Sequence, residues 1–123
     1  MSRSIKTVLI VDDEEALREV IVEILGLLDI DSIEAESGMQ ALELAQAHKD
    51  NIDLFLIDKF MPKMSGEETF AKLNEIIPDR PVIFMSGFGE DAIQISNTSN
   101  SPQKFLKKPF GISDLKDLIT SFM

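Results

Sequence analysis

The chain has 123 residues, with 22 Asp and Glu against 12 Lys and Arg, and a formal net charge of −10. A chain of this length buries roughly two thirds of its unfolded surface as a single domain, so we expect one domain over residues 1–123. Its acidity disfavours direct binding of nucleic acid or anionic lipid. The absence of cysteine excludes disulfides and thiolate sites, and no apolar run approaches the ~20 residues of a membrane span. We therefore expect a cytoplasmic protein without a membrane segment.

Strand and helix patterns alternate from the start of the chain. Residues 5–11 form a β-branched run that predicts a buried strand, and apolar residues at spacings of three and four predict a helix over 14–28. A weaker strand over 30–35 precedes a second helix, whose start is marked by Ser37 and Gln40 in the form of a capping box.

The second half of the chain continues this alternation. An apolar run over 54–57 predicts a strand that stops at Asp58, and Ser65 with Glu68 marks another helix start. The remaining predicted elements are strands over 81–85 and 104–106 and a final helix striped by Ile112, Leu115, Leu118, Ile119 and Phe122. Because crossovers between parallel strands are right-handed, this order predicts an α/β fold with helices on both faces of a parallel sheet.

Polar residues follow four of the predicted strands at their carboxyl ends, the edge where such sheets bind ligands. They are Asp12 and Asp13, Asp58, Ser86 and Lys108. Each alone has an ordinary structural interpretation as a helix cap, a turn residue or a solvated lysine. Turn chemistry does not require a lysine at a strand end, so their coincidence indicates a functional site.

The three aspartates predict a metal site. Carboxylates brought together in one crevice repel each other, and a hard divalent cation with oxygen ligands relieves that repulsion, which favours Mg²⁺. Mg²⁺ keeps open positions for phosphoryl oxygens, and Ser86 and Lys108 would contact the same group from the other side. We then expect Asp58 to be the nucleophile that forms an aspartyl phosphate.

Four motifs carry a family resemblance. They are Val11-Asp12-Asp13-Glu14, Asp58-Lys59-Phe60-Met61-Pro62-Lys63-Met64-Ser65-Gly66, Met85-Ser86-Gly87 and Phe105-Leu106-Lys107-Lys108-Pro109-Phe110. Together they resemble the signatures of the receiver domains of two-component signalling, and the resemblance extends from Thr7 to Phe122. It implies a flavodoxin-like, doubly wound, five-stranded parallel sheet with strand order 2-1-3-4-5.

The resemblance also implies a function. Asp58 would accept a phosphoryl group from a histidine kinase or a histidine phosphotransfer domain, so the chain would be a switch that assists its own phosphorylation and dephosphorylation rather than an enzyme. The implied Mg²⁺ ligands are Asp13, Asp58 and the backbone carbonyl of Phe60, with Asp12 acting largely through water. Ser86 would hydrogen-bond the phosphoryl group, Lys108 would pair with it, and Phe105 would be the aromatic switch residue.

The chain departs from the family pattern at four places. Ser65 stands where an aspartate is common, Gly87 where an alanine is common, and Phe105 lacks the hydroxyl of the frequent tyrosine. Residues 96–101 are six poor helix formers where the family has its fourth helix, so we expect that helix to be short or mobile. The motifs at 86–88 and 105–110 resemble those of receivers attached to hybrid sensor kinases. Self-association on switching and a covalently linked domain both remain open.

Three other functions compete with this interpretation. A phosphohydrolase of the haloacid dehalogenase type also uses a nucleophilic aspartate and Mg²⁺, but its first strand should end in Asp-x-Asp. Asp12 and Asp13 are adjacent, so in an extended chain they should point in different directions. A flavodoxin-type flavin module needs a phosphate cradle where this chain has four acidic residues over 12–15. A degenerate receiver acting only as an interaction surface would not need the full set of site residues.

Overall fold

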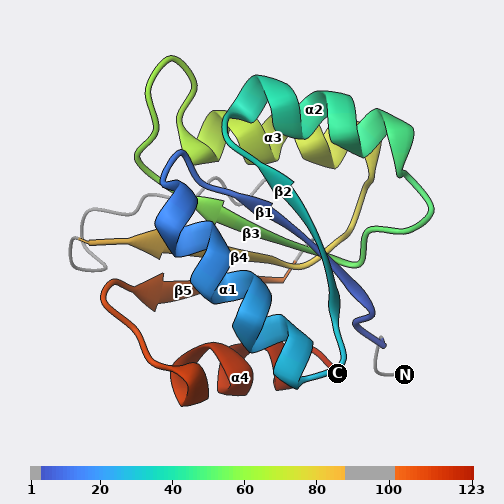
Figure 1. Ribbon diagram of the computed structural model, residues 1–123. Coiled ribbons are helices and arrows are strands. Elements are labelled where there is room, and N and C mark those ends of the chain that lie inside the picture. Colours follow the sequence, from blue (N-terminus) through green and yellow to red (C-terminus); the bar gives the residue numbers. More distant parts are fainter. Residues whose placement is uncertain (1–3, 88–101) are drawn as a thin grey trace.

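A computed structural model describes residues 4–87 and 102–123. It contains one parallel sheet of five strands in the order β2-β1-β3-β4-β5 (Figure 1). The strands are β1 (Thr7–Val11), β2 (Asp31–Ala35), β3 (Leu54–Asp58), β4 (Val82–Ser86) and β5 (Gln103–Lys107). The helices are α1 (Glu15–Leu27), α2 (Gly38–Ala47), α3 (Gly66–Ile76) and α4 (Ile112–Thr120).

The predicted fold class and strand order are therefore confirmed, with small shifts at the element ends. The first strand begins at Thr7 rather than Ile5. Ile5, two residues before the strand, is nevertheless buried in the core. The expected short fourth helix of the family falls in 88–101, outside the residues that the structure describes.

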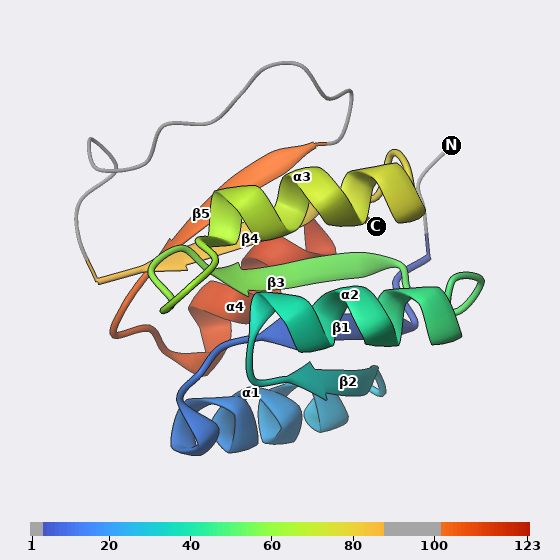
Figure 2. The same cartoon turned by 90° about the horizontal axis from the view of Figure 1, so that it is seen from above.

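Two apolar layers cover the two faces of the sheet. Along β3, Leu54 and Leu56 pack with residues of α1 and α4, whereas Phe55 and Ile57 pack with residues of α2 and α3. Successive side chains of a strand point to opposite faces, so a strand buried on both faces must be apolar at every position. Figure 2 shows the helices divided between the two faces. Within the described ranges, no helix is long and apolar enough to cross a membrane.

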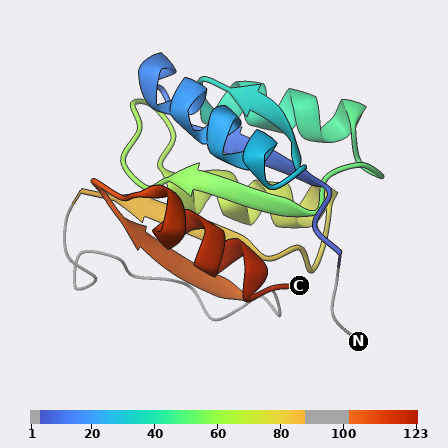
Figure 3. The same ribbon diagram turned by 60° about the horizontal axis from the view of Figure 1, so that its bottom comes forward.

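The strands all run in the same direction, so their carboxyl ends form one edge. The arrowheads of β3, β4 and β5 point to this edge in Figure 1. Figure 3 shows α4 lying over β5 at the side of the sheet. The chain therefore reaches the carboxyl edge when it leaves β5 and then turns back into α4. This path places Lys108, the first residue after β5, near the ends of the central strands.

Serine side chains cap α2 and α3 as the sequence predicts. The hydroxyl of Ser37 accepts a hydrogen bond from the N–H of Gln40, and the hydroxyl of Ser65 accepts one from the N–H of Glu68, both at 3.1 Å. The side chain of Gln40 in turn accepts the N–H of Glu36 at 2.7 Å, one residue before the cap. Each helix thus begins at the carboxyl edge with a serine that satisfies one of its first-turn N–H groups.

Candidate functional site

Three carboxylates from two strand ends meet at the carboxyl edge of the sheet. Asp12 and Asp13 follow β1, and Asp58 is the last residue of β3. One carboxylate oxygen of each lies within 4.8 Å of the other two. The central position of β1 and β3 in the sheet is what brings these side chains together.

Asp12 is fully buried and all four of its polar groups have partners. Its N–H donates to the Ala35 carbonyl at 3.1 Å, and its carboxylate accepts the N–H of Glu14 at 2.9 Å. The other carboxylate oxygen lies 3.2 Å from the ammonium of Lys108. The backbone carbonyl accepts from Nη1 of Arg18 at 2.7 Å, a contact that the sequence pattern did not reveal.

The argument that the adjacent residues Asp12 and Asp13 point apart does not apply to their conformation here, and the predicted cluster of the three aspartates does form. That argument assumed an extended chain, but β1 ends at Val11 and both aspartates lie in the bend that follows it. Asp12 is buried and Asp13 is exposed, yet both bring a carboxylate oxygen to the same cluster. The absence of an Asp-x-Asp spacing therefore does not prevent two ligands from coming out of this loop.

Burial, followed by the charge of the neighbouring Asp12 carboxylate, raises the pKa of the Asp58 carboxyl from 3.8 to about 6. The Lys108 ammonium, 3.5 Å away, opposes this shift, as does the Phe60 N–H that donates to Asp58 at 3.4 Å. Asp58 is thus a carboxyl of low exposure whose ionised form needs more positive charge than Lys108 supplies.

Lys108 lies between two carboxylates. Burial lowers the pKa of its ammonium, but the charges of Asp12 and Asp58 outweigh burial, and the net effect raises the pKa above 10.5. Lys108 is therefore a permanent cation at neutral pH. Its backbone N–H also donates to the Ser86 carbonyl at 2.8 Å, which ties it to the end of β4.

Ser86 ends β4 and is buried at 1% exposure. Its neighbour Met85 pairs with Asp58 in the sheet register, and Ser86 itself pairs with Lys107. Ser86 thus sits between the strand ends that carry Asp58 and Lys108. The four strand ends singled out in the sequence do converge on one edge.

The loop after Asp58 is closed by short contacts to the start of α3. The N–H of Gly66 donates to the Lys59 carbonyl at 2.9 Å, and the ammonium of Lys59 pairs with Glu67 at 3.1 Å. A Cβ at Gly66 would collide with the backbone of Asp58 and Lys59, so only glycine fits there. Phe60, the second residue of this loop, is 48% exposed.

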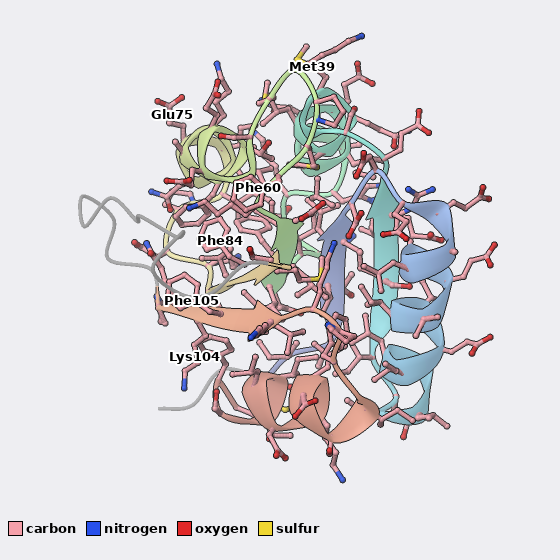
Figure 4. All side chains as sticks on the ribbon, turned by 90° about the vertical axis from the view of Figure 1, so that its left-hand side faces the viewer. Met39, Phe60, Glu75, Phe84, Lys104 and Phe105 are labelled. Atoms are coloured by element: carbon pink, nitrogen blue, oxygen red, sulfur yellow. The ribbon has the colours of Figure 1, made fainter. Side chains whose placement is uncertain are left out.

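Phe105 on β5 is half-buried and its ring stacks on Phe84 of β4, with centroids 6.4 Å apart. Figure 4 labels both residues, which lie on the neighbouring strands β4 and β5. Phe84 in turn meets Phe70 of α3 edge to face at 5.7 Å. An aromatic row thus runs from the sheet edge to α3.

The donors at this edge suit a hard divalent cation. Three carboxylates each offer one oxygen atom within 4.8 Å of the others, and among the described residues no thiolate or imidazole joins this cluster. Oxygen-only donor sets favour Mg²⁺ or Ca²⁺ over zinc. The residues present therefore fit the cation that the sequence predicts.

Comparisons with known proteins agree with this geometry. The response regulator receiver domain model matches residues 8–120. Sensor kinase CckA of Brucella abortus is 33% identical over 117 residues, covering 95% of this chain and 12% of the kinase. Sporulation initiation phosphotransferase F of Bacillus subtilis is 32% identical over 117 residues, covering 94% of this chain and 92% of that protein.

A solved structure of the CheX-CheY-BeF3-Mg complex of Borrelia burgdorferi matches with a TM-score of 0.84 and 25% identity, covering 94% of this chain and 87% of that chain. The chain spans only 12 to 13% of the sensor kinases that it matches. It spans nearly all of the sporulation phosphotransferase. The family match over 8–120, the identity to that relative and the shared fold show that this chain belongs to the response regulator receiver domains, the phosphoacceptor switches of two-component signalling.

Proposed function

We propose that Asp58 is the phosphoacceptor of this receiver and that its donor is a phosphohistidine of a histidine kinase or a histidine phosphotransfer domain. The observation that carries the proposal is the meeting of the Asp12 and Asp13 carboxylates and the Lys108 ammonium around the Asp58 carboxylate. An oxygen of Asp58 attacks phosphorus, the phosphorus–nitrogen bond of the donor breaks, and the histidine leaves as neutral imidazole after taking up a proton.

The proposed Mg²⁺ ligands are Asp13, Asp58 and the backbone carbonyl of Phe60, with Asp12 acting largely through water. Bound there, Mg²⁺ neutralises charge on the phosphoryl oxygens, so that one anion can approach another. The acidic cluster and its all-oxygen donors support this assignment. The chain's own contribution is the Lys108 ammonium, which offsets part of the raised pKa of Asp58.

Ser86 and Lys108 are proposed to hold the phosphoryl group once it is on Asp58. Lys108 already lies 3.5 Å from the acceptor carboxylate, and the buried Ser86 ends the neighbouring strand. We propose that movement of Ser86 toward the phosphoryl group lets Phe105 turn inward. A phenyl ring can do so without burying an unpaired hydroxyl.

We further propose that residues 1–123 form a single receiver domain that acts in the cytoplasm and assists its own phosphorylation and dephosphorylation. The family match over 8–120 and the joining of every described strand into one sheet support the single domain. The identity to a sensor kinase supports a hybrid-kinase origin, with a linked domain or self-association as routes for the output.

Intact mass measured after incubation with acetyl phosphate and Mg²⁺ tests the proposal. The mass should rise by one phosphoryl group, and Asp58→Asn should abolish the increase. Asp53→Asn is the matched control, because Asp53 lies at the other end of β3 and accepts the N–H groups of Lys6 and Thr7. Asn keeps an acceptor oxygen there, so this variant should be labelled normally.

The assignment of Asp58 is wrong if Asp58→Asn takes up the same label, or if chelation of the metal has no effect. Steady turnover of a small phosphate ester would instead favour a phosphohydrolase. A protein that is folded, binds partners and takes up no label would be a degenerate receiver.

A further inference from the structure

Arg18 lies in α1 with a side chain only 12% exposed. Its Nη1 donates to the backbone carbonyl of Asp12 at 2.7 Å. Its Nε pairs with the carboxylate of Glu34 on β2 at 3.3 Å. The guanidinium therefore joins α1, the edge strand β2 and the loop that carries two of the clustered carboxylates.

The carbonyl that Arg18 holds belongs to the peptide unit between Asp12 and Asp13. A peptide unit is planar, so the direction of that carbonyl also determines where the N–H and Cα of Asp13 lie. The side chain of Asp12 is held independently by the N–H of Glu14 and the ammonium of Lys108. Asp13 is exposed and lies in the bend itself, directly after this peptide unit, so its position depends on the direction of the Asp12 carbonyl.

We infer that Arg18 is a positioning residue for the metal site: by holding the Asp12 carbonyl, it orients the Asp13 carboxylate toward Asp58. This inference rests on the Mg²⁺ site proposed above and deepens it. Groups that orient metal ligands from outside typically change metal affinity 10- to 100-fold when they are removed. A carbonyl freed from Arg18 would turn toward water to recover a hydrogen bond, and Asp13 would move with it.

Electrostatics alone predicts the opposite result, which makes the inference testable. Arg18 is a cation next to a cation-binding cluster, so its charge by itself weakens Mg²⁺ binding. Removing the charge should then strengthen binding if Arg18 acts only through its field. If Arg18 acts by positioning Asp13, Arg18→Met should weaken binding.

Isothermal titration of the unphosphorylated protein with MgCl₂ is the measurement, since the chain has no Trp or Tyr to report binding by fluorescence. We expect Arg18→Met to weaken Mg²⁺ binding about tenfold. The matched control is Arg80→Met. Arg80 donates through Nε to the Ile52 carbonyl at 2.8 Å, a contact of the same kind just before β3 begins, at the opposite edge of the sheet. This control should keep the wild-type affinity even if it lowers the melting temperature.

Arg18→Lys is the second variant, should Arg18→Met fail to fold. It keeps the charge but not the planar fork that reaches both Asp12 and Glu34, so its affinity should also fall. Unchanged or tighter Mg²⁺ binding in the folded Arg18 variants would overturn the inference, as would an equal loss in Arg80→Met. Asp13→Asn separates the two proposals. If Asp13→Asn binds Mg²⁺ as wild type does, the proposed metal site itself is wrong. If Asp13→Asn loses Mg²⁺ binding while the Arg18 variants keep it, the metal site is correct and Arg18 does not position it.

Discussion

Asp58 is the residue in which the requirements of folding and of function oppose each other most directly. Burial at the end of β3 and, to a smaller extent, the neighbouring Asp12 carboxylate together raise its pKa to about 6. The phosphoacceptor must nevertheless be ionised to attack phosphorus. Lys108 offsets part of this cost within the chain, and a divalent cation would offset the rest.

This raised pKa predicts a pH dependence of stability in the metal-free protein. A carboxyl whose folded pKa exceeds its unfolded value binds its proton more tightly in the folded state. Its stabilising contribution is complete below about pH 4 and is lost as the pH rises through about 6. The quantity to compare is the unfolding free energy of wild type minus that of Asp58→Asn, both measured in the presence of chelator. This difference should therefore fall by on the order of 2 to 3 kcal/mol between pH 4 and pH 7.

Urea denaturation of both proteins across this range measures the difference, and the subtraction cancels the titration of the other carboxyls. Saturating Mg²⁺ at pH 7 should restore the stability of wild type by mass action and leave the variant nearly unchanged. A difference that stays constant from pH 4 to 7 would show that Asp58 has an ordinary pKa.

Helix α3 is the element that holds the acceptor loop in place. Its first residue, Gly66, packs directly on the backbone of Asp58, and its first-turn Glu67 pairs with Lys59. Ser65 caps this helix through the N–H of Glu68, and its hydroxyl also donates to the Glu68 carboxylate at 3.4 Å. The start of α3 therefore determines the geometry of the residues that follow Asp58.

Removal of the cap should destabilise this element by a measurable amount. Ser65→Ala leaves an N–H of α3 without its acceptor and should lower the unfolding free energy by about 1 kcal/mol. Ser65→Asp retains an acceptor at the same position and adds a favourable charge at a helix N-terminus, so its stability should stay near that of wild type. Guanidinium denaturation provides both values. Equal stability of the alanine variant and wild type would mean that solvent replaces the cap.

At the scale of the whole molecule, the sheet connects Asp58 at the end of β3 to the edge strand β5. The register aligns Asp58 with Met85 and Phe84 with Phe105, so a shift at the end of β4 reaches β5 directly. Contacts of Ser86 and Lys108 with a phosphoryl group would supply roughly 1.5 to 3 kcal/mol each. Their sum is comparable with the ~5.5 kcal/mol needed to invert a 1:99 equilibrium.

We expect the response to phosphorylation to be concentrated at β5. Beryllofluoride with Mg²⁺, standing in for the phosphoryl group, should change amide hydrogen exchange in Gln103–Lys107 more than in α1, because Phe105 stacks on the strand that Ser86 ends. Mass spectrometry of peptides from both segments measures the change. If exchange in β5 is unaltered while Mg²⁺-dependent beryllofluoride binding is saturated, the proposed Phe105 switch is wrong.

Much of this protein could be predicted from the order of its residues. Buried parallel strands need apolar side chains on both faces, so Leu54-Phe55-Leu56-Ile57 identifies a central strand without any tertiary information. The capping serines and the helical stripes are equally local. The strand ends then point to Asp58, Ser86 and Lys108, because every parallel strand delivers its last residue to the same edge.

Only the tertiary structure decided how these groups act on each other. The loop after Val11 departs from an extended chain, and this departure is how the adjacent residues Asp12 and Asp13 both reach the predicted cluster. The crowded aspartates predict repulsion between carboxylates, but burial as the main cause of the raised pKa of Asp58, and the contact of Arg18 with the Asp12 carbonyl, have no signature in the sequence. The physical reason is that periodicity reports which face of an element is buried, whereas charge interactions depend on distances of a few ångströms between residues far apart in the chain. Those distances arise only when the strands are registered and their connecting loops are closed.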